Sequence, residues 1–371
     1  MNRHMMLLMV VMAITMACYN ACDYRYYRER CVTAVAAVMT CFVGFRTWWM
    51  GDLIKYYTLY RSCNAPDWAE KVFEDFSNIG IRLFFKAAGS LGISYDVCLF
   101  LIALLSVGML SLLVYRYSPA PYWSYLMYIS MGIFLFTYSG LKQTIAMAFV
   151  MAAAIGIFED RPKKFVFWTL VATLFHMPAA IFIIAYPIAK KKIDRYYVLL
   201  LVIAVVCVFW FRDQIVGFFS EAYYEDETKY YAKKTIGGRA LMMALFILAG
   251  LMLRPAQRGD KIYSQVVNLM VIAAVIQSFS VYDNVFTRLA DYYYQFVVLH
   301  MPLMLESSDH QLKMGAPYRV RRFTLRSYRA AWFAITLFAL WFYNNTVSGG
   351  GATIADYKFF WEINPYALYG S

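Results

Sequence analysis

Apolar stretches of bilayer-spanning length recur along almost the whole chain, and this repetition limits the fold more than any other feature. We expect a span wherever such a stretch lies between charged or proline-rich connections. The stretches lie near residues 5–19, 31–46, 95–115, 121–138, 141–158, 196–212, 238–254, 262–279, 289–305 and 329–345. Because a helix needs about 20 apolar residues to cross a bilayer, the pattern predicts an all-α polytopic transmembrane bundle of about ten spans.

The composition excludes the other broad classes of protein. Of the 371 residues, 62% are hydrophobic and 16% are charged, with a mean hydropathy of +0.51, whereas soluble domains carry about 25% charged residues. The seven cysteines are scattered and predict neither a disulfide framework nor a thiolate metal site. A signal peptide at 5–18 is the alternative to a first span, which we favour because a second apolar run follows closely. We expect a single membrane domain over residues 1–371, without metal or cofactor.

The stretch 165–189 differs from the others because basic clusters at 161–164 and 190–195 bound both of its ends. A single span would place one cluster on each side of the membrane, whereas a re-entrant pair of half-helices returns both clusters to the cytoplasm. The re-entrant arrangement leaves the larger share of the 35 basic residues on the cytoplasmic side. We expect the break at His176-Met177-Pro178, because proline lacks an amide hydrogen and disfavours helical geometry in the preceding residue.

This topology places two long connections, 46–94 and 213–237, on the outer face, where they would cap an active site. The first contains an apolar run at 79–88 that predicts an interfacial helix. The formal net charge of +12 falls on the cytoplasmic face, where it fits contact with anionic membrane lipids. Nucleic-acid binding is therefore not needed to explain the basic character.

Charged side chains near the membrane are candidate functional residues, because each costs at least about 2.5 to 3.5 kcal/mol at the centre of a span. The polar candidates at the predicted outer boundary are Arg46, Asp52, Lys142, Gln143, Arg288 and Asp291. Three cations around one outer cavity would suit a diphosphate, since guanidinium forks pair with phosphate oxygens. The alternative is that these cations reach lipid headgroups or pair with the two aspartates.

His176 is the histidine predicted to lie deepest in the bilayer. A neutral imidazole beside a sugar hydroxyl would serve as a general base or as a hydrogen-bond anchor, and a buried structural histidine is the alternative. Tyr56, Tyr292 and Tyr293 would stack on sugar rings or belong to the interfacial aromatic belts. The sequence has no Gly-rich phosphate loop and no Asp-x-Asp pair for a metal-bound nucleotide sugar.

Several short motifs, taken in order, resemble those of the EpsG family of membrane proteins, which are Wzy-type polysaccharide polymerases. They are Tyr138-Ser139-Gly140-Leu141-Lys142-Gln143, Ala172-Thr173-Leu174-Phe175-His176, Gly44-Phe45-Arg46 followed by Gly51-Asp52 and Tyr56, and Arg288 with Tyr292-Tyr293. The chain departs from the family at Lys142, where arginine is usual, and in the shortened Gly51-Asp52. Lysine keeps the positive charge but cannot pair bidentately with phosphate.

The resemblance implies a metal-independent glycosyltransferase in the bacterial cytoplasmic (inner) membrane. A growing glycan on undecaprenyl diphosphate would pass to a sugar hydroxyl of a second lipid-linked repeat unit at the outer face. Arg46 and Arg288 would hold the donor diphosphate, Asp52 would orient Arg46 or the acceptor, and His176 would be base or anchor. Lys142, Gln143, Tyr56, Tyr292 and Tyr293 would contact the substrates.

The partners implied are undecaprenyl-diphosphate-linked oligosaccharides, membrane lipids, a flippase and a chain-length regulator, but no nucleic acid. The product would be capsule, exopolysaccharide or O-antigen. Two other classes stay open. A lipid-linked oligosaccharide flippase or transporter predicts charges near mid-membrane, and a polysaccharide acyltransferase that uses His176 predicts access from a cytoplasmic acyl donor.

Overall fold

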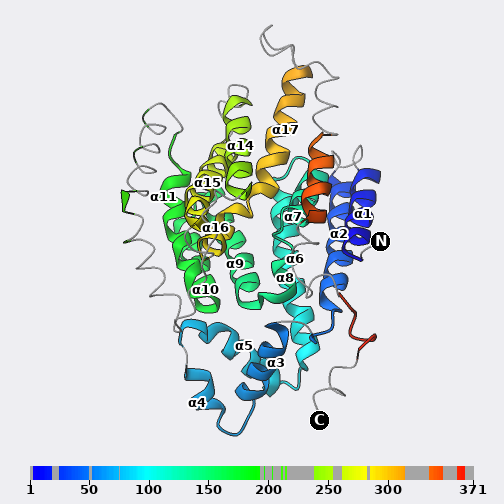
Figure 1. Ribbon diagram of the computed structural model, residues 1–371, viewed down its shortest axis with the longest axis vertical. Helices are drawn as coiled ribbons and strands as arrows, with labels where there is room; N and C mark the ends of the chain where they lie inside the picture. Colours follow the sequence, from blue (N-terminus) through cyan, green and yellow to red (C-terminus); the bar gives the residue numbers. More distant parts are fainter. Residues whose placement is uncertain are drawn as a thin grey trace.

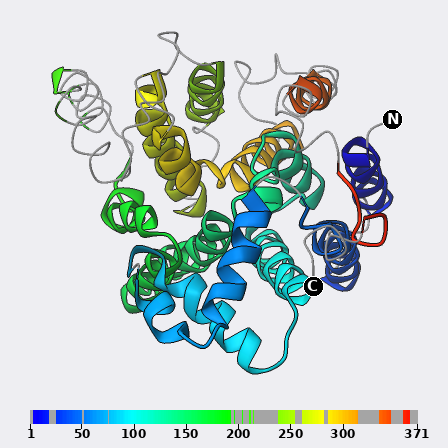
Figure 2. The same cartoon turned by 60° about the horizontal axis from the view of Figure 1, so that its bottom comes forward.

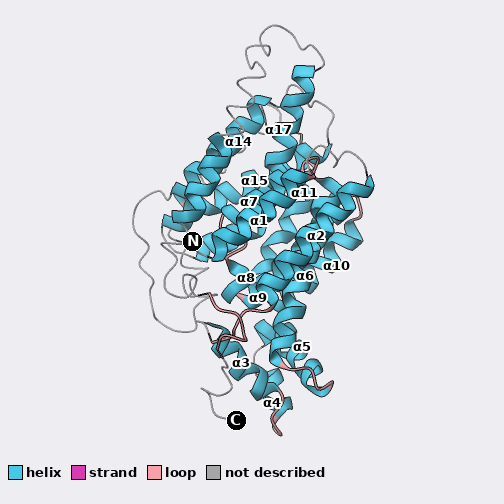
Figure 3. Cartoon of the chain, turned by 90° about the vertical axis from the view of Figure 1, so that its right-hand side faces the viewer, coloured by secondary structure: helices cyan, strands magenta, loops and turns pink. Residues whose placement is uncertain are grey.

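The computed structural model is helical in the parts of the chain that it describes. These are residues 3–18, 25–49, 52–74, 76–192, 196, 203, 210–211, 214, 238–253, 261–281, 285–313, 334–345 and 357–363. Within these ranges no strand forms (Figure 3), and an isolated antiparallel bridge pairs Arg46 with Phe359. The predicted all-α class is confirmed.

Many helices follow the predicted spans closely (Figure 1). They are α1 (Arg3–Ala17), α2 (Arg25–Gly44), α6 (Tyr95–Tyr117), α9 (Leu141–Phe158), α14 (Gly238–Leu253) and α15 (Lys261–Ser278). In the described ranges, α6, α9 and α15 are long and apolar enough to cross a membrane. The total of ten spans stays a prediction, because most of the expected span 196–212 lies outside the described residues.

Two predicted spans are broken in the structure, and the prediction of one continuous helix in each is wrong. The span 121–138 divides into α7 (Pro121–Ser130) and α8 (Phe136–Ser139). Gly132 between them has φ 82°, a left-handed conformation that glycine adopts without steric cost. The span 289–305 divides into α16 (Val285–Tyr294) and α17 (Val297–Lys313). The apolar composition continues through both breaks, so hydropathy does not reveal them.

The predicted outer connection 46–94 folds into a compact helical group at one end of the bundle (Figure 2). Its elements are α3 (Asp52–Cys63), α4 (Trp68–Phe73), the 3₁₀ turn Phe76–Asn78 and α5 (Ile79–Ser90). The α5 helix matches the helix expected at 79–88, and it buries Ile81 and Phe85 in an apolar cluster that includes Leu53 and Tyr95. The other predicted connection, 213–237, lies outside the described residues apart from Gln214.

The chain reverses at His176, inside the stretch for which a re-entrant hairpin was predicted. Helix α10 (Pro162–Phe175) ends there, and the 3₁₀ segment η3 (Met177–Ile184) and α11 (Ala185–Ala189) run back. Asp160, before α10, forms a 2.9 Å ion pair with Lys190, after α11, and also contacts Lys261. The two ends of the hairpin therefore lie together, while its position relative to a membrane stays a prediction.

Charged side chains gather at two ends of the bundle, which α6 connects over a length of about 34 Å. At its start, the Tyr95 hydroxyl donates to the Leu53 carbonyl at 2.9 Å; we call this the α5 end. At its finish, Arg116 forms a 3.2 Å ion pair with Glu159, in the connection between α9 and α10; we call this the turn end. Helix α10 starts at the turn end and runs toward the α5 end. His176, which follows its last residue, therefore lies on the side of the bundle that faces the α5 end.

Gly80 allows α5 to pack against the last residues of α10, immediately before His176. A Cβ atom at this position would lie 2.7 Å from the Leu174 carbonyl oxygen, which is closer than the backbone allows. We expect Gly80→Ala to separate the two helices, to destabilise the protein by about 1–3 kcal/mol and to lower its melting temperature in detergent.

The matched control is Gly108→Ala in α6, where an added Cβ meets nothing within 4 Å. This variant is expected to melt at the same temperature or slightly higher, since alanine is favoured over glycine in helices by up to about 1 kcal/mol. Equal melting temperatures for Gly80→Ala and the unaltered chain would contradict the close approach of α5 and α10.

Candidate functional site

Three segments that are far apart in the sequence meet beside His176. The Nδ1 atom of His176 lies 2.6 Å from the hydroxyl of Tyr292 in α16. The Gln143 side chain, in the first turn of α9, donates to the Arg288 carbonyl at 3.1 Å. Lys142 and Arg288 both interact electrostatically with the imidazole. The structure thus gathers these five predicted residues into one group, which we call the His176 cluster.

The local backbone explains why polar groups collect there. Lys142 and Gln143 lie at the amino end of α9, where backbone N–H groups lack helical partners and carry partial positive charge. His176 follows the last residue of α10 in an extended conformation, with φ −152° and ψ 103°. Pro178 then prevents the helix from continuing without interruption. The start of α9 and the end of α10 therefore both face α16, which carries Arg288 and Tyr292.

The members of the His176 cluster differ in exposure. Arg288 is exposed and Lys142 is partly buried, whereas Gln143 and Tyr292 are buried. His176 is partly buried between them. Two cations thus act on an imidazole that the Tyr292 phenol contacts from inside the bundle, while the Gln143 amide holds the Arg288 backbone. This arrangement suits an anion held next to a group that can exchange a proton.

The predicted stacking role of Tyr292 and Tyr293 has no direct support from their placement. Both rings are fully buried, with 0% of their surface exposed. Tyr293 donates from its hydroxyl to the Ile181 carbonyl at 2.6 Å, so it ties α16 to η3. Sugar stacking by these rings stays a prediction, and the contact observed for Tyr292 is with His176.

Arg46 is buried at the α5 end among tyrosine side chains. Its guanidinium is 1% exposed, and one nitrogen donates to the Val43 carbonyl at 2.5 Å. Its Nε and Nη2 atoms are buried without a hydrogen-bond partner. Its electrostatic neighbours are the phenol groups of Tyr95, Tyr138 and Tyr357, and we call these four residues the Arg46 pocket. Lys142 and Arg288 interact with His176, and the expected grouping of all three cations around one cavity stays a prediction.

Asp52 and Tyr56 both lie in α3. The Asp52 carboxylate is exposed and forms a 3.2 Å ion pair with Lys55, three residues further along the helix. None of the ion pairs among the described residues joins it to Arg46. Tyr56 is partly buried against the apolar cluster around Trp48. Their contacts with a substrate stay predictions.

Sequence reasoning missed one cation of this region, Arg239 in the first turn of α14. Its guanidinium forms an ion pair with Asp291, whose carboxylate is fully buried, and lies 4.4 Å from the ring centre of Tyr294. Asp291 follows Arg288 by three residues and directly precedes Tyr292, so Arg239 anchors α16 at the cluster. Arg239 begins a predicted span just as Arg288 does, and treating every boundary cation as a candidate would have found it.

Metal binding has no evident site in the part of the chain that the structure describes. No group of three or more His, Cys, Asp or Glu side chains there is placed to hold an ion. The expectation that the protein needs no metal stays a prediction.

The fold and the cluster define a helical membrane protein with a cationic site at one end of its bundle, and comparison with protein families identifies its class. The EpsG family model matches residues 29–315, more than three quarters of the 371-residue chain. The chain therefore belongs to the EpsG family, whose general role is that of Wzy-type polysaccharide polymerases. Comparison with curated proteins and with solved structures gives no match.

Tyr292→Phe tests whether the phenol orients His176. Removing the hydroxyl takes away the hydrogen-bond partner of Nδ1 and frees the ring to change tautomer and orientation. We expect glycan polymerisation to slow by at least about tenfold, within the range that acid–base catalysis contributes. Tyr263→Phe is the matched control, because its buried hydroxyl bonds to the Gly250 carbonyl at 2.7 Å instead. Equal rates for the two variants would exclude an orienting role.

The Arg239–Asp291 pair should be strongly coupled. Asp291→Asn leaves the Arg239 charge without its carboxylate, and breaking a buried pair in this way destabilises proteins by about 3–5 kcal/mol. The double variant Asp291→Asn with Arg239→Gln has no unpaired charge, so we expect it to recover part of that loss. Unfolding in detergent of the unaltered chain, the two single variants and the double variant measures the coupling energy between the two side chains. Additive effects of the two substitutions would show that the pair makes no net contribution.

Proposed function

We propose that this protein polymerises lipid-linked oligosaccharide repeat units at the outer face of the bacterial cytoplasmic membrane. The growing glycan on undecaprenyl diphosphate is the donor, and a second lipid-linked repeat unit is the acceptor. The observation that carries the proposal is the convergence of Lys142, Arg288 and His176 from three distant segments of a chain that belongs to the EpsG family.

The reaction has two charge requirements, and the His176 cluster offers a group for each. The bond between the donor sugar and its diphosphate breaks, so negative charge develops on the leaving diphosphate. Lys142 and Arg288 stabilise this charge in place of a metal ion. The acceptor hydroxyl loses its proton as it bonds to the donor sugar, and His176 takes up that proton. For this step Nδ1 donates to the Tyr292 oxygen and Nε2 is the basic atom.

The two cations have different parts in this scheme. Arg288 presents a planar fork that pairs with two phosphate oxygens, whereas Lys142 acts as a point charge. Gln143 holds the backbone of Arg288 through its 3.1 Å hydrogen bond, and Arg239 holds the same helix through Asp291. The cluster is therefore fixed to α9 and α14 before a substrate arrives, which favours electrostatic stabilisation of the transition state.

The distribution of charge supports an orientation with the α5 end outside. Arg116, Lys164 and Lys190 lie at the turn end, and loops rich in Lys and Arg stay in the cytoplasm. In this orientation about ten spans cross the membrane, 165–189 enters and leaves on the cytoplasmic side, and the His176 cluster faces outward. A flippase would need its charges near the middle of the bundle, and the gathering of charge at the α5 end supports the polymerase instead.

Replacing Arg288 tests this proposal directly. In a strain that lacks the native gene, Arg288→Ala is expected to slow polymerisation by about 10²- to 10³-fold, as the loss of a group that stabilises a developing anion does in other enzymes. Sizing of the surface glycan should then show single repeat units. Arg116→Ala is the control, because its ion pair with Glu159 lies at the turn end. Long chains at normal abundance from Arg288→Ala would remove Arg288 from the mechanism, and the absence of any repeat unit outside the cell would indicate a flippase.

A further inference from the structure

A short segment near the C-terminus pairs with the residues around Arg46. We call residues 357–363 the C-terminal strap. The Thr47 amide donates to the Lys358 carbonyl, and the Phe360 amide donates to the Phe45 carbonyl, both at 2.9 Å. These two hydrogen bonds place Phe359 directly opposite Arg46. Figure 2 shows the strap, in red, beside the blue helices of the N-terminal region.

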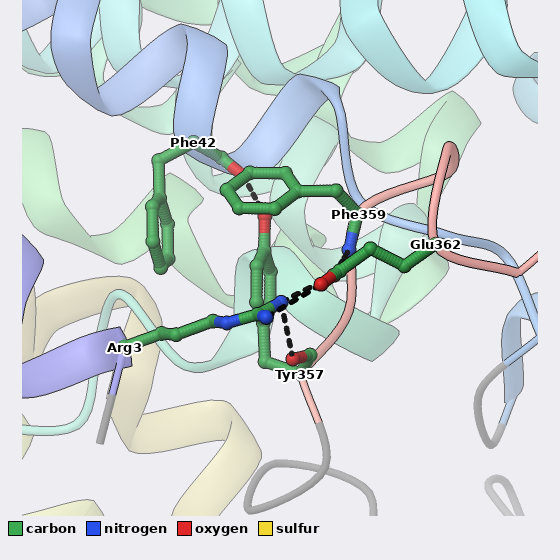
Figure 4. Close-up of polar contacts among 5 residues, drawn as sticks. All are labelled: Arg3, Phe42, Tyr357, Phe359 and Glu362. Carbon is green, nitrogen blue, oxygen red and sulfur yellow. Dashed lines mark hydrogen bonds and ion pairs between the residues drawn. The ribbon is translucent and has the colours of Figure 1, made fainter. Parts of the chain in front are cut away.

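An ion pair between the two ends of the chain holds the strap in place (Figure 4). The Arg3 guanidinium donates to one Glu362 oxygen at 2.5 Å, contacts the other, and donates to the Tyr357 carbonyl at 3.3 Å. The Phe359 amide donates to the same carboxylate at 2.8 Å. The hydrogen bond from Arg3 holds the pKa of Glu362 at about 2, so the carboxylate is ionised. We call Arg3 and Glu362 the latch.

The inner side of the strap inserts Tyr357 into the Arg46 pocket. Its ring stacks on Phe42 with centroids 4.5 Å apart, and lies 5.3 Å from His4 and 5.6 Å from Tyr138. Its hydroxyl donates to the Phe42 carbonyl, and the residue is 4% exposed. Tyr357 therefore forms the outer wall of the pocket, as Figure 4 shows for its contacts with Phe42 and Arg3.

The pocket behind this wall holds a charge that the described chain does not neutralise. Arg46 is 1% exposed, two of its three nitrogens have no hydrogen-bond partner, and no described carboxylate pairs with it. A buried charge without a counter-ion is unfavourable, since the interior solvates it poorly. The unpaired nitrogens of a guanidinium are the donors that pair with phosphate oxygens.

We propose that the Arg46 pocket binds a diphosphate ester and that the C-terminal strap closes it, with the latch holding the strap shut. The identity of the anion rests on the proposed function, in which two lipid-linked diphosphates take part and the His176 cluster receives one of them. The latch lies at the surface, with the Arg3 and Glu362 side chains 40% and 30% exposed. Arg3 and the strap both lie outside residues 29–315, the range that the family model matches.

The experiment measures binding to the purified full chain in detergent by titration calorimetry and stopped-flow fluorescence. The probes are geranylgeranyl diphosphate and inorganic pyrophosphate, and the Arg46-dependent part of binding is the difference from the Arg46→Gln variant. Thr47→Cys with Lys358→Cys staples the strap, because opposed residues of an antiparallel pair lie about 5.5 Å apart at Cα, within reach of a disulfide. The staple should weaken this part of binding at least tenfold, and a reductant should restore it.

Opening the latch should have the opposite effect. Glu362→Gln is expected to speed association of the probe at least threefold, and the charge exchange Arg3→Glu with Glu362→Arg should return the rate toward its original value. Lys358→Cys alone is the control for the staple and should respond neither to oxidant nor to reductant. Because the staple forms on folded protein and is reversible, its result does not depend on a variant that fails to fold.

The outcomes separate this inference from the proposed function. Equal Arg46-dependent binding by the stapled and reduced chains would overturn the closure, and pyrophosphate binding without binding of the lipid diphosphate would overturn the assignment to a lipid-linked substrate. Sizing of the surface glycan made by the unaltered chain is independent of both. If the staple changes Arg46-dependent binding but the unaltered chain makes no polymer, the proposed polymerase activity is refuted and the closure by the strap is not.

Discussion

The unfavourable free energy of charge in an apolar environment is the constraint on which the rest of this structure depends. The bundle resolves it in two ways. Asp291 is fully buried and has Arg239 as a counter-ion supplied by another helix. Arg46 is equally buried, but tyrosines surround it and no described carboxylate pairs with it. A charge that the chain itself compensates fixes structure, whereas one that it leaves uncompensated favours a ligand.

Interrupted helices are the second feature of the structure, and they too reflect the free energy of placing polar groups in an apolar environment. A continuous helix satisfies its own backbone and offers only side chains, whereas a helix end presents unpaired N–H or C=O groups. The chain breaks at Gly132, at His176 and at Gln295-Phe296. The break at Gln295-Phe296 is fully buried in protein, where irregular backbone is tolerated at membrane depth. The His176 cluster forms where the start of α9 and the end of α10 meet α16, so polar groups of a mainly apolar chain collect at one place.

Particular residues show how far the sequence alone leads. The runs at 95–115, 141–158 and 262–279 became α6, α9 and α15 nearly as predicted, because long apolar stretches with polar ends have few alternatives. The breaks inside 121–138 and 289–305 were missed, since helical and interrupted backbone there have the same composition. Lys142 and Arg288 were selected as cations at predicted span ends, and His176 as a histidine at the predicted break of the hairpin. Both cations interact with His176 in the structure. Arg239 was missed because nothing in the sequence connects it to Asp291.

The sequence by itself determined the helical membrane class, the family and the residues of the His176 cluster. Apolar length and the polar residues within it are local properties that hydropathy and short motifs record. Only the tertiary structure decided that tyrosines surround Arg46, that Arg239 neutralises Asp291, and that Glu362 returns to Arg3 across almost the full chain. These are contacts between distant segments. They depend on which helix ends come together, and packing of the whole bundle fixes that rather than any one segment.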